Sequence, residues 1–79
     1  MTEIRKNILE CLKKVFPDYM DKDSLKICAK IDDVGLENEV QYLKNEDCIE
    51  AGKTKDPDFM LVRITFTGAR ALAATDVKD

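Results

Sequence analysis

The three cysteines are the residues of this chain with the widest choice of chemistry, but their spacing argues against most of it. Cys11, Cys28 and Cys48 lie far apart, no two of them form a C-x-x-C pair, and the 79-residue chain has no histidine. Zinc sites and disulfide frameworks usually show closely or regularly spaced ligands. We therefore expect three reduced thiols, no metal, no other cofactor and a reducing, cytoplasmic environment.

Groups that catalyse reactions are equally scattered. The chain has no glycine-rich phosphate loop, and no serine or cysteine lies at a useful spacing from a base. A single domain of this length closes one small core and cannot form a cleft between two domains. The sequence therefore predicts that the protein is not an enzyme and gives no sign of a small-molecule ligand.

The overall composition is that of a soluble globular domain, with 44% hydrophobic and 37% charged residues. No apolar run approaches the roughly 20 residues of a membrane span, and the charged start "MTEIRKNILE" does not resemble a signal peptide. The formal net charge is −3. Because proteins that bind nucleic acid mainly through phosphates are usually basic, this charge disfavours a purely electrostatic DNA binder.

Apolar residues at three- and four-residue steps predict two helices at the start of the chain. The first covers residues 3–16 and is capped by Thr2. The second is short, covers residues 25–31 and is capped by Asp23 or Ser24.

A third helix begins after a cap at Asp32 and ends at residues 45–47. Its predicted buried stripe consists of Leu36, Val40 and Leu43. The outward side of this helix then determines what it can bind.

The second half of the chain predicts two strands and a helix. Residues 48–52 and 59–64 read as strands joined by a polar loop, and the second run is rich in β-branched and aromatic residues. Thr65 or Thr67 caps a last helix that ends at about Ala74. The two strands cannot stand alone in water and must lay their apolar face on the helices.

This order resembles the winged helix-turn-helix family over roughly residues 3–74. In that family the second helix ends in an apolar residue and a polar cap, which match Ile31 and Asp32, and the wing ends in Leu-Thr-x-x-Gly, which "ITFTG" at 64–68 matches. The resemblance implies an α+β fold with three helices, a β-hairpin wing and a C-terminal helix. We expect one domain over residues 1–79, with a frayed tail at 75–79.

We make a further prediction for Asp47, before the first strand, and for Gly68, in the last helix. Asp47 stands where the family has a turn glycine, and aspartate tolerates the left-handed backbone of such a turn. Gly68 lies inside the last helix, where it costs helix propensity unless it allows a close approach to a neighbour.

The resemblance also implies DNA binding, with the third helix in the major groove and the wing on the phosphates. On this reading the protein is a small transcription-regulator-like protein of a prokaryote, phage or archaeon. The expected contacts are Asn38, Gln41, Tyr42 and Lys44 at the groove, and Lys53, Lys55 and Arg63 on the phosphates. The charge opposes this, because residues 33–46 contain four acids and one base.

The alternative is a winged helix that binds a protein partner or a second copy of itself and not DNA. The acidic third helix would offer one surface, and the outer face of the second strand would offer another. The residues concerned are Val34, Glu37, Glu39 and Tyr42 on the helix, and Phe59 and Leu61 on the strand.

Overall fold

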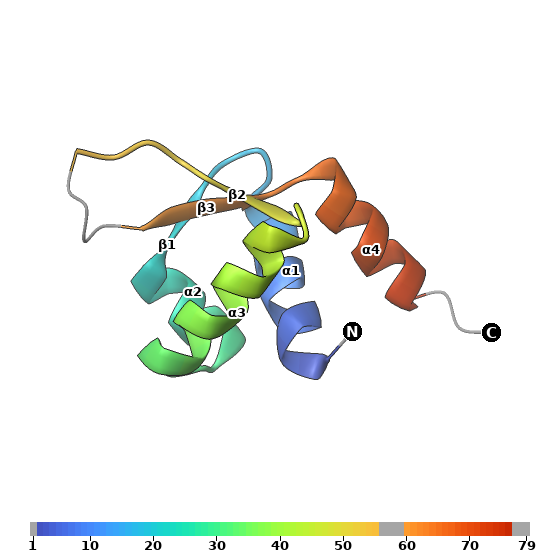
Figure 1. Ribbon diagram of the computed structural model, residues 1–79, viewed down its shortest axis with the longest axis horizontal. Coiled ribbons are helices and arrows are strands. Elements are labelled where there is room, and N and C mark those ends of the chain that lie inside the picture. Colours follow the sequence, from blue (N-terminus) through green and yellow to red (C-terminus); the bar gives the residue numbers. More distant parts are fainter. Residues whose placement is uncertain (1, 56–59, 77–79) are drawn as a thin grey trace.

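The computed structural model describes residues 2–55 and 60–76, which form four helices and a small sheet (Figure 1). In chain order the elements are α1 (Glu3–Val15), β1 (Met20–Asp21), α2 (Lys22–Ala29), α3 (Asp33–Asn45), β2 (Ile49–Ala51), β3 (Leu61–Ile64) and α4 (Phe66–Asp76). The predicted α+β arrangement of three helices, a hairpin and a C-terminal helix is confirmed. In the described part of the chain, no helix has the length and apolar character needed to cross a membrane.

Two of the three predicted helix starts in the first half are confirmed. The hydroxyl oxygen of Thr2 accepts a hydrogen bond from the backbone N–H of Arg5, and the carboxylate of Asp32 accepts one from Gly35 at 2.8 Å. The predicted cap of α2 is wrong, because the helix begins three residues earlier with Asp21 as its cap. Ser24 donates both its hydroxyl and its backbone N–H to the Asp21 carboxylate, which lowers the pKa of that acid.

The sheet has a strand that the sequence did not indicate. Its order is β1-β3-β2, and both pairings are antiparallel. Met20 lies opposite Val62 on one side of β3, and Ala51 lies opposite Val62 on the other. The strand β1 has two residues in a polar connector, too short a stretch to show an alternating pattern.

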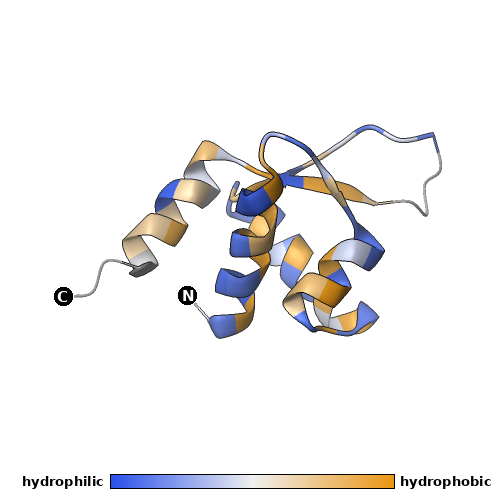
Figure 2. Ribbon diagram, turned by 180° about the vertical axis from the view of Figure 1, so that it is seen from behind, coloured by the Kyte–Doolittle hydropathy of each residue, from blue (hydrophilic) through white to orange (hydrophobic). Residues whose placement is uncertain are grey.

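The core lies between the helices and one face of the sheet. As predicted, Leu36, Val40 and Leu43 are buried, and so are Val62 and Ile64 of β3. The helix α1 occupies the centre, in contact with α2, α3, α4 and β3. Figure 2 shows the apolar and polar sides of the helices that this packing requires.

Two local features shape the chain next to the sheet: a left-handed residue before β2 and a side-chain cap at the start of α4. Asp47 has a left-handed backbone with a φ of 61°, and Thr65 caps α4 by accepting from the N–H of Gly68 at 3.0 Å, both as predicted. The Thr65 hydroxyl also donates to the carbonyl of Asp47. A Cβ on Gly68 would lie 2.1 Å from the carbonyl oxygen of Cys48, so the close approach is confirmed, but the neighbour is the turn before β2.

The helix α4 runs two residues beyond the predicted end. Residues 75 and 76, which lie in the predicted frayed tail at 75–79, belong to this helix. The rest of that tail lies outside the described residues, as does Phe59.

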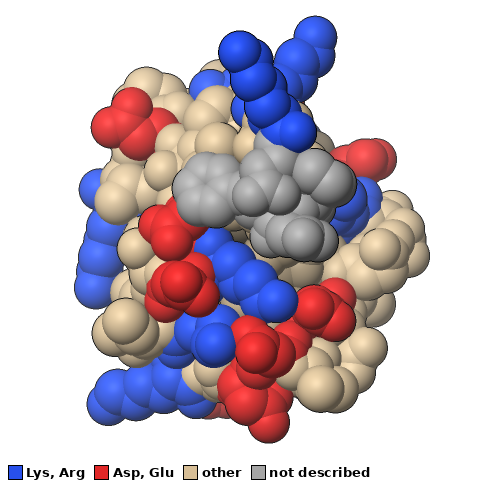
Figure 3. Space-filling model, turned by 90° about the vertical axis from the view of Figure 1, so that its left-hand side faces the viewer, with Lys and Arg blue, Asp and Glu red and all other residues tan. Residues whose placement is uncertain are grey.

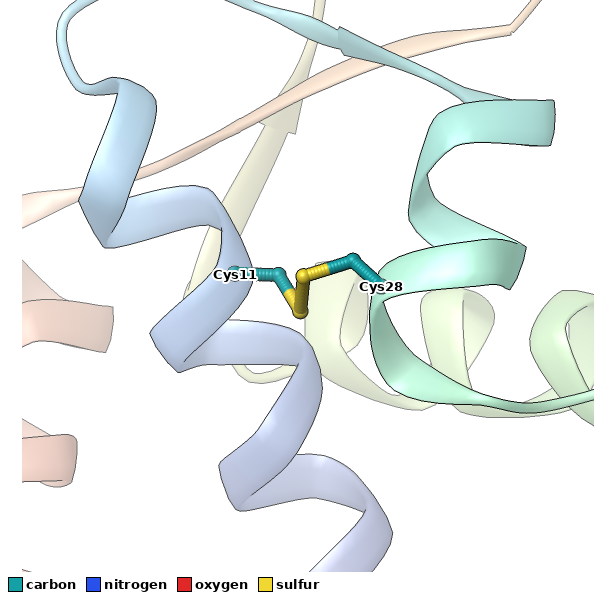
Figure 4. The surroundings of a disulfide bond; sticks show 2 residues. All are labelled: Cys11 and Cys28. Atoms are coloured by element: carbon teal, nitrogen blue, oxygen red, sulfur yellow. A yellow bond between two sulfur atoms is a disulfide. The ribbon is translucent and has the colours of Figure 1, made fainter.

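The expectation of three reduced thiols is wrong for two of them. Cys11 of α1 and Cys28 of α2 form a disulfide with 6.2 Å between their Cα atoms (Figure 4). Cys48 is free and buried. The two partners are 17 residues apart in the sequence, and it is the packing of α2 on α1 that brings them together. The prediction of a reducing compartment therefore loses its main support. Burial raises the pKa of the Cys48 thiol, which disfavours the reactive thiolate.

Candidate nucleic-acid interface

The helix α3 presents an uncharged stripe on the side opposite its buried residues. Val34, Asn38, Gln41 and Asn45 recur at three- and four-residue steps and are all exposed, Val34 to 68%. The amide of Gln41 donates to the side-chain oxygen of Asn45 at 3.1 Å. Asn38 and Gln41 are predicted site residues that the structure brings together, whereas Asn45 was not predicted and is recognisable only by its spacing from Gln41.

One flank of this stripe faces α2 and is crossed by ion pairs. Lys26 Nζ lies 2.7 Å from Asp33 Oδ1, and Lys22 Nζ lies 3.1 Å from Glu37 Oε2. The ammonium of Lys26 holds the pKa of the Asp33 carboxyl below its usual value, and the bond to Glu37 raises the pKa of Lys22. The Asp33 carboxylate and the Lys22 ammonium are therefore charged at neutral pH.

The other flank faces α1, where a single arginine contacts two predicted site residues. Arg5 Nε lies 2.6 Å from Glu39 Oε1, and its guanidinium stacks over the ring of Tyr42 at 3.5 Å from the centroid. The side chains of Arg5 and Glu39 are 25% and 22% exposed, so the pair is partly shielded from water. These contacts could not be predicted from the sequence, because Arg5 lies 34 residues from Glu39.

These pairs change the electrostatics that the sequence suggests for α3. Its three flanking carboxylates, Asp33, Glu37 and Glu39, each contact a cation from a neighbouring helix. The charges of these pairs consequently sum to zero, although α3 by itself is acidic. Lys44 is exposed and has no ion pair within the described residues.

In the wing, the three predicted phosphate contacts fall into two groups. Lys53 and Lys55 are exposed in the β2–β3 loop, and within residues 2–55 and 60–76 neither has an ion pair. Arg63, in contrast, lies on the sheet, where its Nε is 2.7 Å from Glu50 Oε2 and its guanidinium stands over Tyr19. Figure 3 shows basic and acidic side chains interspersed on this side of the molecule, without one continuous basic stripe.

Of the apolar residues expected on a partner-binding surface, Val34 and Tyr42 are exposed on α3, whereas Leu61 on the sheet is not fully exposed. Leu61 is partly buried, and Phe59 lies outside the described residues. The prominent exposed aromatic residue is Phe66 at the start of α4, which is 82% exposed. With Phe16 and Ile64 it lines a pocket of about 270 Å³ between α1 and α4.

Comparison with known proteins identifies the fold. No family model matches the chain, and no curated protein matches it at a significant level. Two solved structures of the PcaV transcriptional regulator from Streptomyces coelicolor, one of them in complex with its natural ligand, superpose on 92% of this chain with a TM-score of 0.81 each. They are 18% and 19% identical to it, and the chain spans about half of their length, 53% and 51%. The chain therefore has a winged helix-turn-helix fold, in which α2 and α3 form the helix-turn-helix and the β2–β3 hairpin forms the wing.

Proposed function

We propose that this chain is a transcription-regulator-like module that binds double-stranded DNA, with α3 in the major groove and the wing on the phosphates. One observation carries the proposal: the carboxylates of α3 are paired with Arg5, Lys22 and Lys26, which leaves an uncharged, amide-bearing stripe outermost. Amide side chains on an exposed helix are suited to hydrogen bonding with base edges.

The residues proposed to bind divide by role. Asn38 and Gln41 contact bases, and Lys44, Lys53 and Lys55 contact phosphates. Tyr42 and Arg63 support the site, because each is already held within the protein, Tyr42 by Arg5 and Arg63 by Glu50. On this proposal the protein is a regulator and not an enzyme.

The proposal predicts that the affinity for DNA depends only weakly on salt concentration. If each of the three exposed lysines replaces about one counterion, the slope of log affinity against log salt is about −3, shallower than that of a strongly basic DNA-binding protein. Titrating a labelled mixed-sequence duplex with the protein at low and at moderate salt measures this slope. The proposal fails if no binding is detected at low salt.

A charge reversal identifies the face that binds. Lys44→Glu places an acid on α3 and should weaken binding to every sequence. Lys14→Glu makes the same change at an exposed position of α1 and serves as the control. Equal weakening by both variants would show that the effect comes from net charge and would remove the argument for α3.

A second candidate function is self-association, favoured by the exposed Phe66 beside an apolar pocket. The occupant would be a second copy of the chain, since Phe66 of one copy can enter the pocket of the other in a two-fold arrangement. Sedimentation equilibrium of the parent and of Phe66→Ser tests this. A parent that stays monomeric at high concentration would exclude it.

A further inference from the structure

We infer that the exposed stripe of α3 selects A·T base pairs, with Asn38 bonding to adenine and Val34 packing on the methyl group of thymine. This inference rests on the proposed function and specifies the DNA sequences that the same site recognises. The inference follows from the side chains that occupy the stripe and from those that are held away from it.

Asn38 is the amide of the stripe whose donor and acceptor are both free to bond to a base, whereas Gln41 can contact a base only through the hydrogen-bonding atoms that its bond to Asn45 leaves free. The side chain of Asn38 is exposed and makes no hydrogen bond within the described residues. An asparagine amide offers one acceptor and one donor side by side, which matches the N6 amino group and the N7 atom of adenine in the major groove.

Val34 supplies the apolar half of the readout. It lies in the first turn of α3, where recognition helices contact base edges, and 68% of it is exposed to solvent. Thymine is the base that carries a methyl group in the major groove. Val34 lies one turn before Asn38, or about 6 Å along the helix axis, which corresponds to roughly two base-pair steps.

The groups that would favour G·C pairs are absent from the stripe or held elsewhere. The helix α3 contains no arginine, the usual partner of guanine, and Lys44 lies about a quarter-turn away from the centre of the stripe. A carboxylate could accept from the amino group of cytosine, but Glu37 is held by Lys22 at 3.1 Å.

The first test is to select binding duplexes from a pool with a randomised centre, at low salt. We expect enrichment of A·T pairs at two positions about two base-pair steps apart. Enrichment of G·C pairs, or binding without any sequence preference but with the expected salt dependence, would overturn this inference and leave the proposed function intact. Absence of binding to any duplex would overturn both.

The second test assigns the contacts to atoms. Replacing thymine by uracil in the selected duplex removes only the methyl group and should weaken binding of the parent several-fold. Val34→Ala should lose about the same factor on the thymine duplex and show no further loss on the uracil duplex. Additive losses would show that Val34 does not contact this methyl group.

The corresponding pair for adenine is Asn38→Ala and a duplex in which 7-deazaadenine replaces adenine. Each change alone should weaken binding about tenfold, and the two together should weaken it little further. Independent, additive losses would place Asn38 away from adenine. Because both residues are exposed, the variants should keep the parent's circular dichroism spectrum.

Discussion

Two pairs of lysines, Lys22 and Lys26 in α2 and Lys53 and Lys55 in the wing, carry the same charge in opposite surroundings. The lysines of α2 contact Asp33 and Glu37 of α3, whereas those of the wing project from a loop and have no ion pair within the described residues. The comparison shows why a count of charges is a poor guide to this surface. One pair neutralises α3, and the other remains available for a ligand.

The disulfide that joins α1 and α2 gives the largest expected effect on stability. Removing the Cys11–Cys28 disulfide, which joins positions 17 residues apart in the sequence, should destabilise the protein by about 3 kcal/mol. Urea unfolding of the parent with and without reductant measures the loss. The Cys28→Ser variant should match the reduced parent, because Cys28 is exposed and its replacement leaves little cavity. Identical midpoints with and without reductant would contradict this account.

The contact between Gly68 of α4 and the carbonyl of Cys48 should have the second-largest effect on stability. Gly68→Val would force side-chain atoms into the carbonyl of Cys48, and we expect a loss of roughly 1–3 kcal/mol from overpacking. Ala73→Val adds the same β-branched side chain at an exposed position of α4 and serves as the control in thermal unfolding. If the two variants lose equal stability, Gly68 has no packing role.

A smaller effect is expected where α1 meets α3. Arg5→Lys keeps the charge near Glu39 but removes the planar group that stacks on Tyr42, and should cost about 0.5–1 kcal/mol. Lys14→Arg, at an exposed position of the same helix, is the matched control in urea unfolding. A loss no greater than that of the control would show that the stacking contributes nothing.

The smallest expected effect is the pH dependence of the stability that Asp33 contributes. The pKa of Asp33 is lowered by Lys26, so its contribution to stability is complete above the ordinary value of 3.8 and is lost as the pH falls through the lower folded-state pKa. Because the pair is exposed, the contribution should be slight. Unfolding curves of the parent and Asp33→Asn should converge as the pH falls below 3.8. A constant difference across this range would contradict the assignment.

The parts of the fold that local patterns encode were predictable from the sequence. The buried stripe of α3, the Thr65 cap and the left-handed Asp47 each depend on a few neighbouring residues. The cap at Asp21 was missed because Asp21 competes with several nearby polar residues, and β1 because two residues carry no pattern.

The candidate site was harder to predict because its properties arise between distant segments. Asn38 and Gln41 were identifiable from their place on α3. Arg5 reaches Glu39 across 34 residues, and Arg63 pairs with Glu50 across the sheet, so a count along α3 or along the wing missed both. The disulfide was missed for the same reason, since no local motif marks it.

The central claim is that the wing lysines bind phosphates while the lysines of α2 neutralise α3. Measuring the salt dependence of DNA binding for Lys53→Gln/Lys55→Gln and for Lys22→Gln/Lys26→Gln tests this directly, because each variant loses the same charge. We predict that the wing variant flattens the slope of log affinity against log salt by nearly 2. The α2 variant should leave the slope unchanged and lower the thermal stability. Equal flattening by both variants, or an unchanged slope in the wing variant, would contradict the account.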